Sequence, residues 1–129
     1  MSQIRTTKVK VKNARRRKTS STRWLQRQLN DPYVTQAKAE GYRSRAVYKL
    51  IELDQQLHLI KPQAKILDLG AAPGSWSEYA ARKGAYVTAI DLLEFPAIEG
   101  VTSIIGDFTN HSFIEQSLLE IYPDQPKFD

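Results

Sequence analysis

The sequence contains no cysteine and no long apolar run, and each absence excludes a class of protein. Without cysteine there is neither a disulfide framework nor a thiolate metal site, and the composition is compatible with a reducing cytosol. No apolar stretch approaches the length of a membrane span, and the first residues lack the apolar segment that a secretory signal needs. We therefore expect a cytoplasmic protein without a metal site and outside the membrane.

Acidic residues are scarce in the first half of the chain. Residues 1–61 hold 15 lysines and arginines against 4 aspartates and glutamates, and residues 62–129 hold 4 against 10, so the halves carry +11 and −6 of the net +5. This division predicts a basic surface joined to an acidic domain. Residues 1–19 have no hydrophobic period and are expected to form a disordered basic arm. Its dense basic run favours a polyanion partner over a solubilising tail, and it has too few apolar residues for the amphipathic helix of a mitochondrial presequence.

The remainder is apolar enough for one folded domain and begins with a helical pattern. A hydroxyl residue from positions 20–22 is expected to cap a short first helix, which Asn30 ends. Asp31 followed by Pro32 predicts the cap and first turn of a second helix, which ends at Gly41.

A third helix is expected from Ser44, its predicted cap, to the break before Pro62. Lys49 lies at the border between its apolar and polar faces, where position alone favours a side chain reaching to solvent. The apolar residues recur at three- and four-residue spacing; they are Ala46, Val47, Leu50, Leu53, Leu57 and Ile60.

After Pro62 the pattern changes to strands alternating with helices. We expect strands over 66–69, 85–92 and 103–105, and helices over 75–84 and 113–122. Ser75 and Glu78 have the spacing of a capping box at the start of the first of these helices. The alternation with short loops predicts an α/β fold with a parallel, doubly wound sheet.

Three strand ends carry acidic residues or glycines: Gly70–Gly74, Asp91 and Asp107. In a doubly wound sheet, ligands bind beyond the carboxyl ends of the strands. Asp91 lies 21 residues after Gly70, near the roughly 20-residue spacing that brings an acid to a ribose hydroxyl. A tight turn would explain Gly70 alone, but not the ordered series that starts at Asp68. The ligand is therefore expected to be an adenosine-type molecule.

The glycine loop departs from two phosphate-binding fingerprints. A dinucleotide motif starting at Gly70 needs glycine where Ala72 and Ser75 stand, and a P-loop needs a lysine where Ser75-Trp76 follow Gly74. The loop is thus poorly suited to phosphates. It fits close backbone approach to a ligand without them, such as S-adenosylmethionine.

Three segments together resemble the FtsJ (RrmJ) family of bacterial ribosomal RNA large-subunit methyltransferases E: Ser21–Leu25, Ser44–Leu50 and Asp68–Ser77. Ser75 departs from the family, where many members carry a second glycine. The resemblance implies a Rossmann-like class I S-adenosylmethionine-dependent methyltransferase. Residues 20–129 would hold the N-terminal helices and the first half of its domain, truncated after the third strand and the following helix.

The resemblance also implies roles for particular residues. Asp91 would contact the ribose of S-adenosylmethionine and Asp107 would lie near its adenine. Lys49 matches the first member of the family's Lys-Asp-Lys-Glu catalytic set, whose other members would follow Asp129. With the loop residues, the predicted cofactor set is Asp68, Gly70, Gly74, Trp76, Asp91 and Asp107.

The role of Lys49 stays open between two alternatives. A free lysine side chain has a pKa of about 10.4 and is a poor base unless it is desolvated or near another cation. Arg45, expected one turn before Lys49, could supply part of that effect. A protonated Lys49 could instead stabilise the developing alkoxide or the ribose.

The implied substrate is a uridine 2′-hydroxyl of 23S rRNA in the large ribosomal subunit, methylated by a monomer. Basic residues would bind phosphates without base specificity. A non-catalytic RNA- or ribosome-binding module and a small-molecule methyltransferase with an incidental basic tail are the alternatives. The predicted RNA-binding residues are Arg15, Arg16, Arg17, Lys18, Arg23, Arg43 and Arg45.

Overall fold

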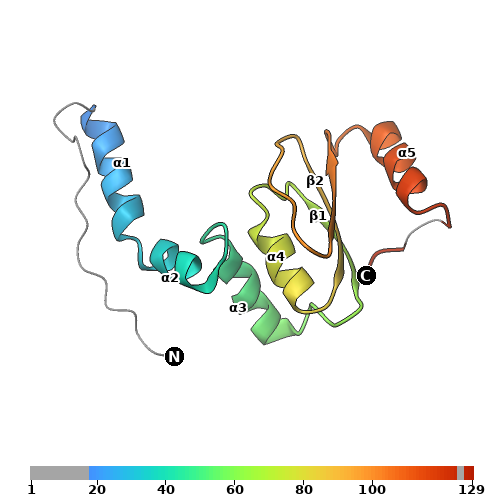
Figure 1. Ribbon diagram of the computed structural model, residues 1–129, viewed down its shortest axis with the longest axis horizontal. Coiled ribbons are helices and arrows are strands. Elements are labelled where there is room, and N and C mark those ends of the chain that lie inside the picture. Colours follow the sequence, from blue (N-terminus) through green and yellow to red (C-terminus); the bar gives the residue numbers. More distant parts are fainter. Residues whose placement is uncertain (1–17, 125–126) are drawn as a thin grey trace. The chain divides into compact units, whose positions relative to one another are not determined.

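The computed structural model describes residues 18–124 and 127–129, which form two compact units divided between Arg45 and Ala46 (Figure 1). Residues 1–17 of the predicted basic arm lie outside the described residues, and with them Arg15, Arg16 and Arg17. Each unit is described by itself.

The first unit contains α1 (Thr19–Asn30) and α2 (Pro32–Glu40). Positions 20–22 do not cap α1, because the helix has already begun at Thr19: the carbonyl of Lys18 accepts from Thr22 N at 2.9 Å. The predicted end at Asn30 is confirmed.

Both predicted ends of α2 are confirmed. Asp31 Oδ1 accepts from the backbone N–H groups of Tyr33 at 2.8 Å and Val34 at 3.4 Å, and Pro32 occupies the first turn. Gly41 ends the helix with φ 79°, a left-handed conformation that glycine adopts without strain.

The second unit is built on a parallel sheet of β1 (Lys65–Leu69), β2 (Tyr86–Asp91) and β3 (Val101–Ile105), in the order β1-β2-β3. Lys65 pairs with Tyr86, and Val87 with Val101, so the carboxyl ends of all three strands lie at one edge. The predicted α/β fold with parallel strands is confirmed.

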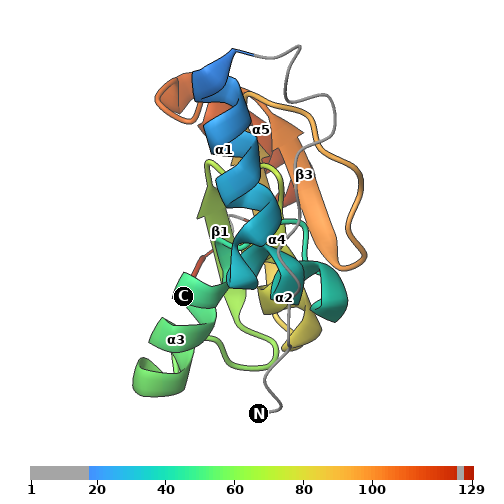
Figure 2. The same cartoon turned by 90° about the vertical axis from the view of Figure 1, so that its left-hand side faces the viewer.

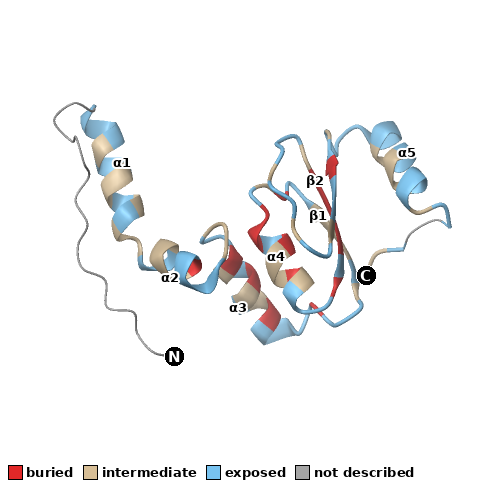
Figure 3. Ribbon diagram, in the orientation of Figure 1, coloured by how far each residue is buried: buried red, intermediate tan, exposed pale blue. Residues whose placement is uncertain are grey.

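Two helices complete the core of this unit (Figures 1 and 2). α4 (Ser75–Arg82) contacts all three strands, and α3 (Val47–Leu57) contacts α4. Figure 3 shows buried residues on α3, α4 and β2. A further helix, α5 (His111–Ile121), has no buried residue. The core cluster consists of Leu50, Ile60, Ala80, Ala85 and Val87.

The predicted start and apolar face of α3 need correction. Ser44 does not cap this helix, which begins at Val47 after Ala46 without a side-chain cap. Leu57 is 61% exposed although Ile60 is buried. Between these two residues His58 ends the helix in a left-handed conformation (φ 51°), which redirects the chain.

The predicted capping box of α4 is also wrong. Gly74 occupies the N-cap position, Ser75 is the first helical residue, and no side chain caps the helix. Glu78 instead lies 3.9 Å from Arg82 Nη2, one turn further along.

Candidate functional site

The loop after β1 is attached to the end of β2. The backbone N–H groups of Gly70 and Ala71 donate to Ile90 O at 2.8 and 3.2 Å. Gly70 has φ 73°, and an added Cβ would meet nothing within 4 Å. A side chain is therefore excluded by the backbone conformation there, and the space beside Gly70 is open to a ligand.

Gly74 is required for a different reason. Its φ is 108°, and an added Cβ would lie 2.7 Å from Ile98 Cδ1 and 3.3 Å from the ring of Phe95. The close approach at Gly74 is therefore made by the protein's own segment between β2 and β3. That segment carries no periodic signal in the sequence, and its contact with the glycine loop was not predicted.

Asp91, at the end of β2, joins two loops. Its Oδ2 accepts from Ala72 N at 2.9 Å and its Oδ1 from Leu93 N at 2.8 Å. The hydrogen bonds from Leu93 and Ala72 lower the pKa of Asp91, because they stabilise its charged form. The carboxylate is thus ionised at neutral pH, and it can accept a further hydrogen bond from a ligand hydroxyl.

Asp68 lies on β1, the strand beside β2, one residue before the end of the strand. The pKa of Asp68 is raised above its usual value. Burial is the largest cause, the hydrogen bond from Ser77 opposes it, and the charge of Asp91 adds to it. Ser77 Oγ donates to Asp68 Oδ2 at 2.7 Å. Asp68 therefore connects β1 to the first turn of α4.

Asp107 follows β3 at the same edge. Gly106 N donates to Asp91 O at 2.9 Å, which ties the loop after β3 to β2. Asp107 Oδ1 accepts from the hydroxyl and the backbone N–H of Thr109, at 2.6 and 2.8 Å, and these bonds lower the pKa of Asp107. The structure therefore brings the three predicted acidic residues to one edge of the sheet.

The charge of this edge fits a phosphate-free, cationic ligand. Residues 68–77 contain no lysine or arginine, Asp91 is ionised beside the loop, and Asp107 is ionised at the end of β3. Phosphates would be repelled there, whereas a sulfonium would be attracted and a ribose could donate its hydroxyls. The residues present thus fit S-adenosylmethionine.

Trp76 and Lys49 lie on the two helices next to this edge. Trp76, in the first turn of α4, is 39% exposed, and its indole Nε1–H donates to Ala46 O at 2.8 Å. Lys49 is exposed and stands three residues after Ala46 on α3. The Trp76–Ala46 hydrogen bond was not predicted, because no local pattern connects residues 30 positions apart.

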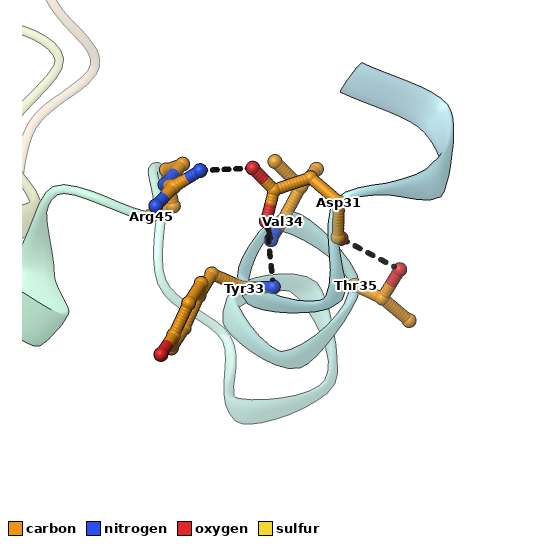
Figure 4. A network of polar contacts seen from close by, with 5 residues as sticks. All are labelled: Asp31, Tyr33, Val34, Thr35 and Arg45. Atoms are coloured by element: carbon orange, nitrogen blue, oxygen red, sulfur yellow. Dashed lines mark hydrogen bonds and ion pairs between the residues drawn. The ribbon is translucent and has the colours of Figure 1, made fainter. Parts of the chain in front are cut away.

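The predicted RNA-binding residues within the described range differ in their surroundings. Lys18 and Arg23 are exposed, and Arg43 is half-buried. Arg45 forms an ion pair with Asp31 Oδ2, and its guanidinium lies 5.0 Å from the centre of the Tyr33 ring (Figure 4). The expected place of Arg45 one helical turn before Lys49 is wrong, because α3 begins at Val47.

Two features are absent from the described residues. Residues 18–124 and 127–129 hold no group of three or more potential metal-ligating side chains of the kind that holds an ion. Within the same ranges, no helix combines the length and the apolar character needed to cross a membrane.

A family model described as FtsJ-like methyltransferase matches residues 42–126. The chain belongs to the FtsJ-like methyltransferase family. The match includes α3, the glycine loop and all three acidic strand ends, so the resemblance seen in the motifs is confirmed.

Named relatives of this FtsJ-like chain agree with the assignment. Proteins named Ribosomal RNA large subunit methyltransferase E from Maricaulis maris and Zymomonas mobilis are each 59% identical to it over 102 and 103 residues. The alignments cover 78% of this chain, but 37% and 47% of those proteins. The chain thus spans about half the length of its curated relatives, or less.

A solved structure supports the fold. It is described as a ribosomal RNA methyltransferase from Plasmodium falciparum and is 34% identical, with a TM-score of 0.62. The similarity covers 68% of this chain and 53% of that one. The Rossmann-like methyltransferase fold expected from the motifs is therefore confirmed.

Proposed function

We propose that the whole protein transfers a methyl group from S-adenosylmethionine to the 2′-hydroxyl of a uridine in 23S rRNA of the large ribosomal subunit, acting as a cytoplasmic monomer. The observation that carries this proposal is the carboxyl edge of the sheet. There, the open space at Gly70 and the ionised carboxylates of Asp91 and Asp107 lie at the ends of three adjacent parallel strands. The names of the relatives support an rRNA substrate.

The proposed cofactor contacts use the hydrogen-bond acceptor positions that remain on the carboxylates at this edge. S-Adenosylmethionine supplies an electrophilic methyl group on its sulfonium. Asp91, already fixed by Ala72 N and Leu93 N, accepts from the ribose hydroxyls. Asp107 binds near the adenine through Oδ2, since Oδ1 is engaged by Thr109. Because the first two contacts of Asp91 are made in advance, binding requires little reorganisation of the carboxylate.

Lys49 is the proposed catalytic residue. It is exposed on α3. In the proposal its side chain either stabilises negative charge developing on the ribose oxygen or takes up the proton of the ribose hydroxyl. Arg45 does not assist it in our proposal, because its guanidinium is paired with Asp31.

In this proposal, exposed basic residues contact the phosphates of the RNA. Lys18 and Arg23 are exposed in the first unit, and Arg15, Arg16 and Arg17 precede them in the sequence. Such contacts supply affinity that depends on salt and carries no base specificity.

The test is methyl transfer from labelled S-adenosylmethionine to purified large ribosomal subunits by the whole protein. Lys49→Ala should lower the single-turnover rate by at least about a hundredfold, as for a positioned catalytic group, with S-adenosylmethionine affinity unchanged. Lys61→Ala, an exposed lysine beyond the end of α3, is the matched control and should retain the rate. Binding of subunits without any methyl transfer would instead favour the alternative, a non-catalytic ribosome-binding module.

A further inference from the structure

The helix that carries Lys49 is joined to the cofactor-loop helix at both of its ends. At its start, Ala46 O accepts from Trp76 Nε1 at 2.8 Å. At its end, Asp54 Oδ2 accepts from Tyr79 Oη at 2.7 Å. Trp76 and Tyr79 both lie on α4, which begins directly after Gly74. Two side-chain hydrogen bonds to one short helix therefore add to the core packing of Leu50 and Ala80 in placing α3 relative to the glycine loop.

The Asp54 end is a fixed anchor. Asp54 is only 4% exposed, and its Oδ1 accepts from Ile60 N at 2.8 Å, across the left-handed turn at His58. The hydrogen bond from Tyr79 is the main cause that lowers the pKa of Asp54, and Lys83 Nζ lies 3.7 Å from Oδ2. A buried carboxylate with partners at both oxygens is held in place, because losing any partner would leave a buried polar group unsatisfied.

The Trp76 end controls the part of α3 nearer to Lys49. The indole N–H of Trp76 donates to Ala46 O, the carbonyl directly before Val47, the first residue of α3. Residues three apart lie on neighbouring turns of one helix face, and Lys49 is three residues after Ala46. The Trp76–Ala46 bond therefore lies one helical turn from Lys49.

The base of Trp76 is itself held by the cofactor loop. Gly74, two residues earlier, is packed against Ile98 and Phe95 in a left-handed conformation. Ser77, one residue later, is buried and donates to Asp68. The indole therefore projects from a rigid support that also carries the proposed cofactor site.

We propose that Trp76 is a positioning residue for Lys49: its indole N–H, working with the Asp54 anchor, sets the place of the lysine relative to the bound methyl donor. This inference rests on the proposed function, because it requires Lys49 to act in methyl transfer. It differs from the cofactor contact that the family resemblance implies for Trp76. A positioning residue changes the rate of transfer at saturating cofactor, whereas a cofactor contact changes the affinity.

The test begins with Trp76→Phe, which keeps an aromatic ring and removes the N–H donor. In the whole protein, the single-turnover rate at saturating S-adenosylmethionine should fall by about tenfold, near the upper value of one neutral hydrogen bond. The dissociation constant for S-adenosylmethionine should stay within about twofold, a change too small to count as a lost contact. Trp24→Phe, at the other tryptophan of the chain, is the matched control and should change neither value.

A double-mutant cycle then decides whether Trp76 acts through Lys49. In a Lys49→Ala background, adding Trp76→Phe should lower the residual rate by less than about twofold, because the group that it positions is gone. A full tenfold loss in that background would overturn the proposal. So would a weaker affinity for S-adenosylmethionine with an unchanged saturated rate, since that result would assign Trp76 to the cofactor.

Failure of the proposed function and failure of the positioning role give different results. If Lys49→Ala alone methylates at the wild-type rate, the proposed function of Lys49 fails and the positioning role falls with it. If Trp76→Phe does not fold, Tyr79→Phe loosens the other end of α3 by removing one bond to Asp54. It should lower the rate in the wild-type background but not in the Lys49→Ala background, and equal losses in both would overturn the proposal.

Discussion

Replacing Asp91 by asparagine should weaken both S-adenosylmethionine binding and the loop structure. The two carboxylate oxygens of Asp91 accept from Ala72 N and Leu93 N. Asparagine keeps one acceptor oxygen and places an NH2 group against the other backbone donor. One N–H is left without its partner, which costs about 1–3 kcal/mol of stability, with the lower part of that range expected at this partly exposed edge.

The expected loss of S-adenosylmethionine affinity in Asp91→Asn is a separate quantity. A charge-assisted hydrogen bond to the ribose is worth about 1–3 kcal/mol, so the dissociation constant should rise roughly 5- to 150-fold. Glu94→Gln is the matched control, because it removes the same formal charge from an exposed residue three positions later. Calorimetric titration with S-adenosylmethionine and a thermal melt measure the two effects. If both variants bind equally well and melt together, Asp91 neither holds the loop nor contacts the ribose.

The pH dependence follows from the lowered pKa of Asp91. The usual value is 3.8, and the folded value lies below it. The ionised carboxylate is therefore fully present above pH 3.8 and is lost only as the pH falls through the lower, folded pKa. The contribution of Asp91 to cofactor affinity should be constant between pH 8 and pH 5. A loss of that contribution centred near pH 6 would contradict the hydrogen-bond network seen here.

Four other substitutions test separate parts of the structure. Gly74→Ala should lower stability by more than about 1 kcal/mol, measured by chemical denaturation, because its φ is 108° and its Cβ would lie 2.7 Å from Ile98; an unchanged midpoint would refute the packing. Asp54→Asn should cost about 1–3 kcal/mol at pH 7. Since the pKa of Asp54 is lowered from 3.8, this difference from wild type should persist down to that pH and shrink below it. Arg23→Gln should reduce the salt dependence of RNA binding by about one phosphate contact, whereas Arg45→Gln, already paired with Asp31, should not; equal effects would contradict the pairing.

The parts of the fold that the sequence predicts are those with a local signal. β2 is a run of β-branched and apolar residues that ends in Asp91, and each strand of the sheet lies within four residues of its expected bounds. The order of glycine loop and acidic strand ends follows from chain order alone, because parallel strands place their carboxyl ends at one edge. The site could therefore be located before its contacts were known.

The predicted starts of α3 and α4 were wrong because tertiary contacts override local capping preferences. Ser44 and Ser75 both have the side chain of a good cap, yet Ala46 and Gly74 take the N-cap positions. Gly74 is held by the segment between β2 and β3, and the carbonyl of Ala46 is held by Trp76. Such choices depend on residues distant in sequence and have no local pattern.

Asp54 could not be recognised from the sequence for a similar reason. On a helical pattern it is one acidic residue between Leu53 and Gln55, with no distinguishing mark. Its burial depends on the left-handed turn at His58, which returns Ile60 N to the carboxylate. A non-glycine residue in that conformation is uncommon and is not signalled by composition.

The central claim is tested most directly by identifying the methylated nucleoside. The whole protein would be incubated with labelled S-adenosylmethionine and large ribosomal subunits that lack the modification. The rRNA would then be digested to nucleosides and examined by mass spectrometry. We predict one labelled product, 2′-O-methyluridine, formed by the wild-type protein and formed at least about a hundredfold more slowly with Lys49→Ala. Label on a base, label on a small molecule alone, or no label with an intact, subunit-binding protein would contradict the proposed function.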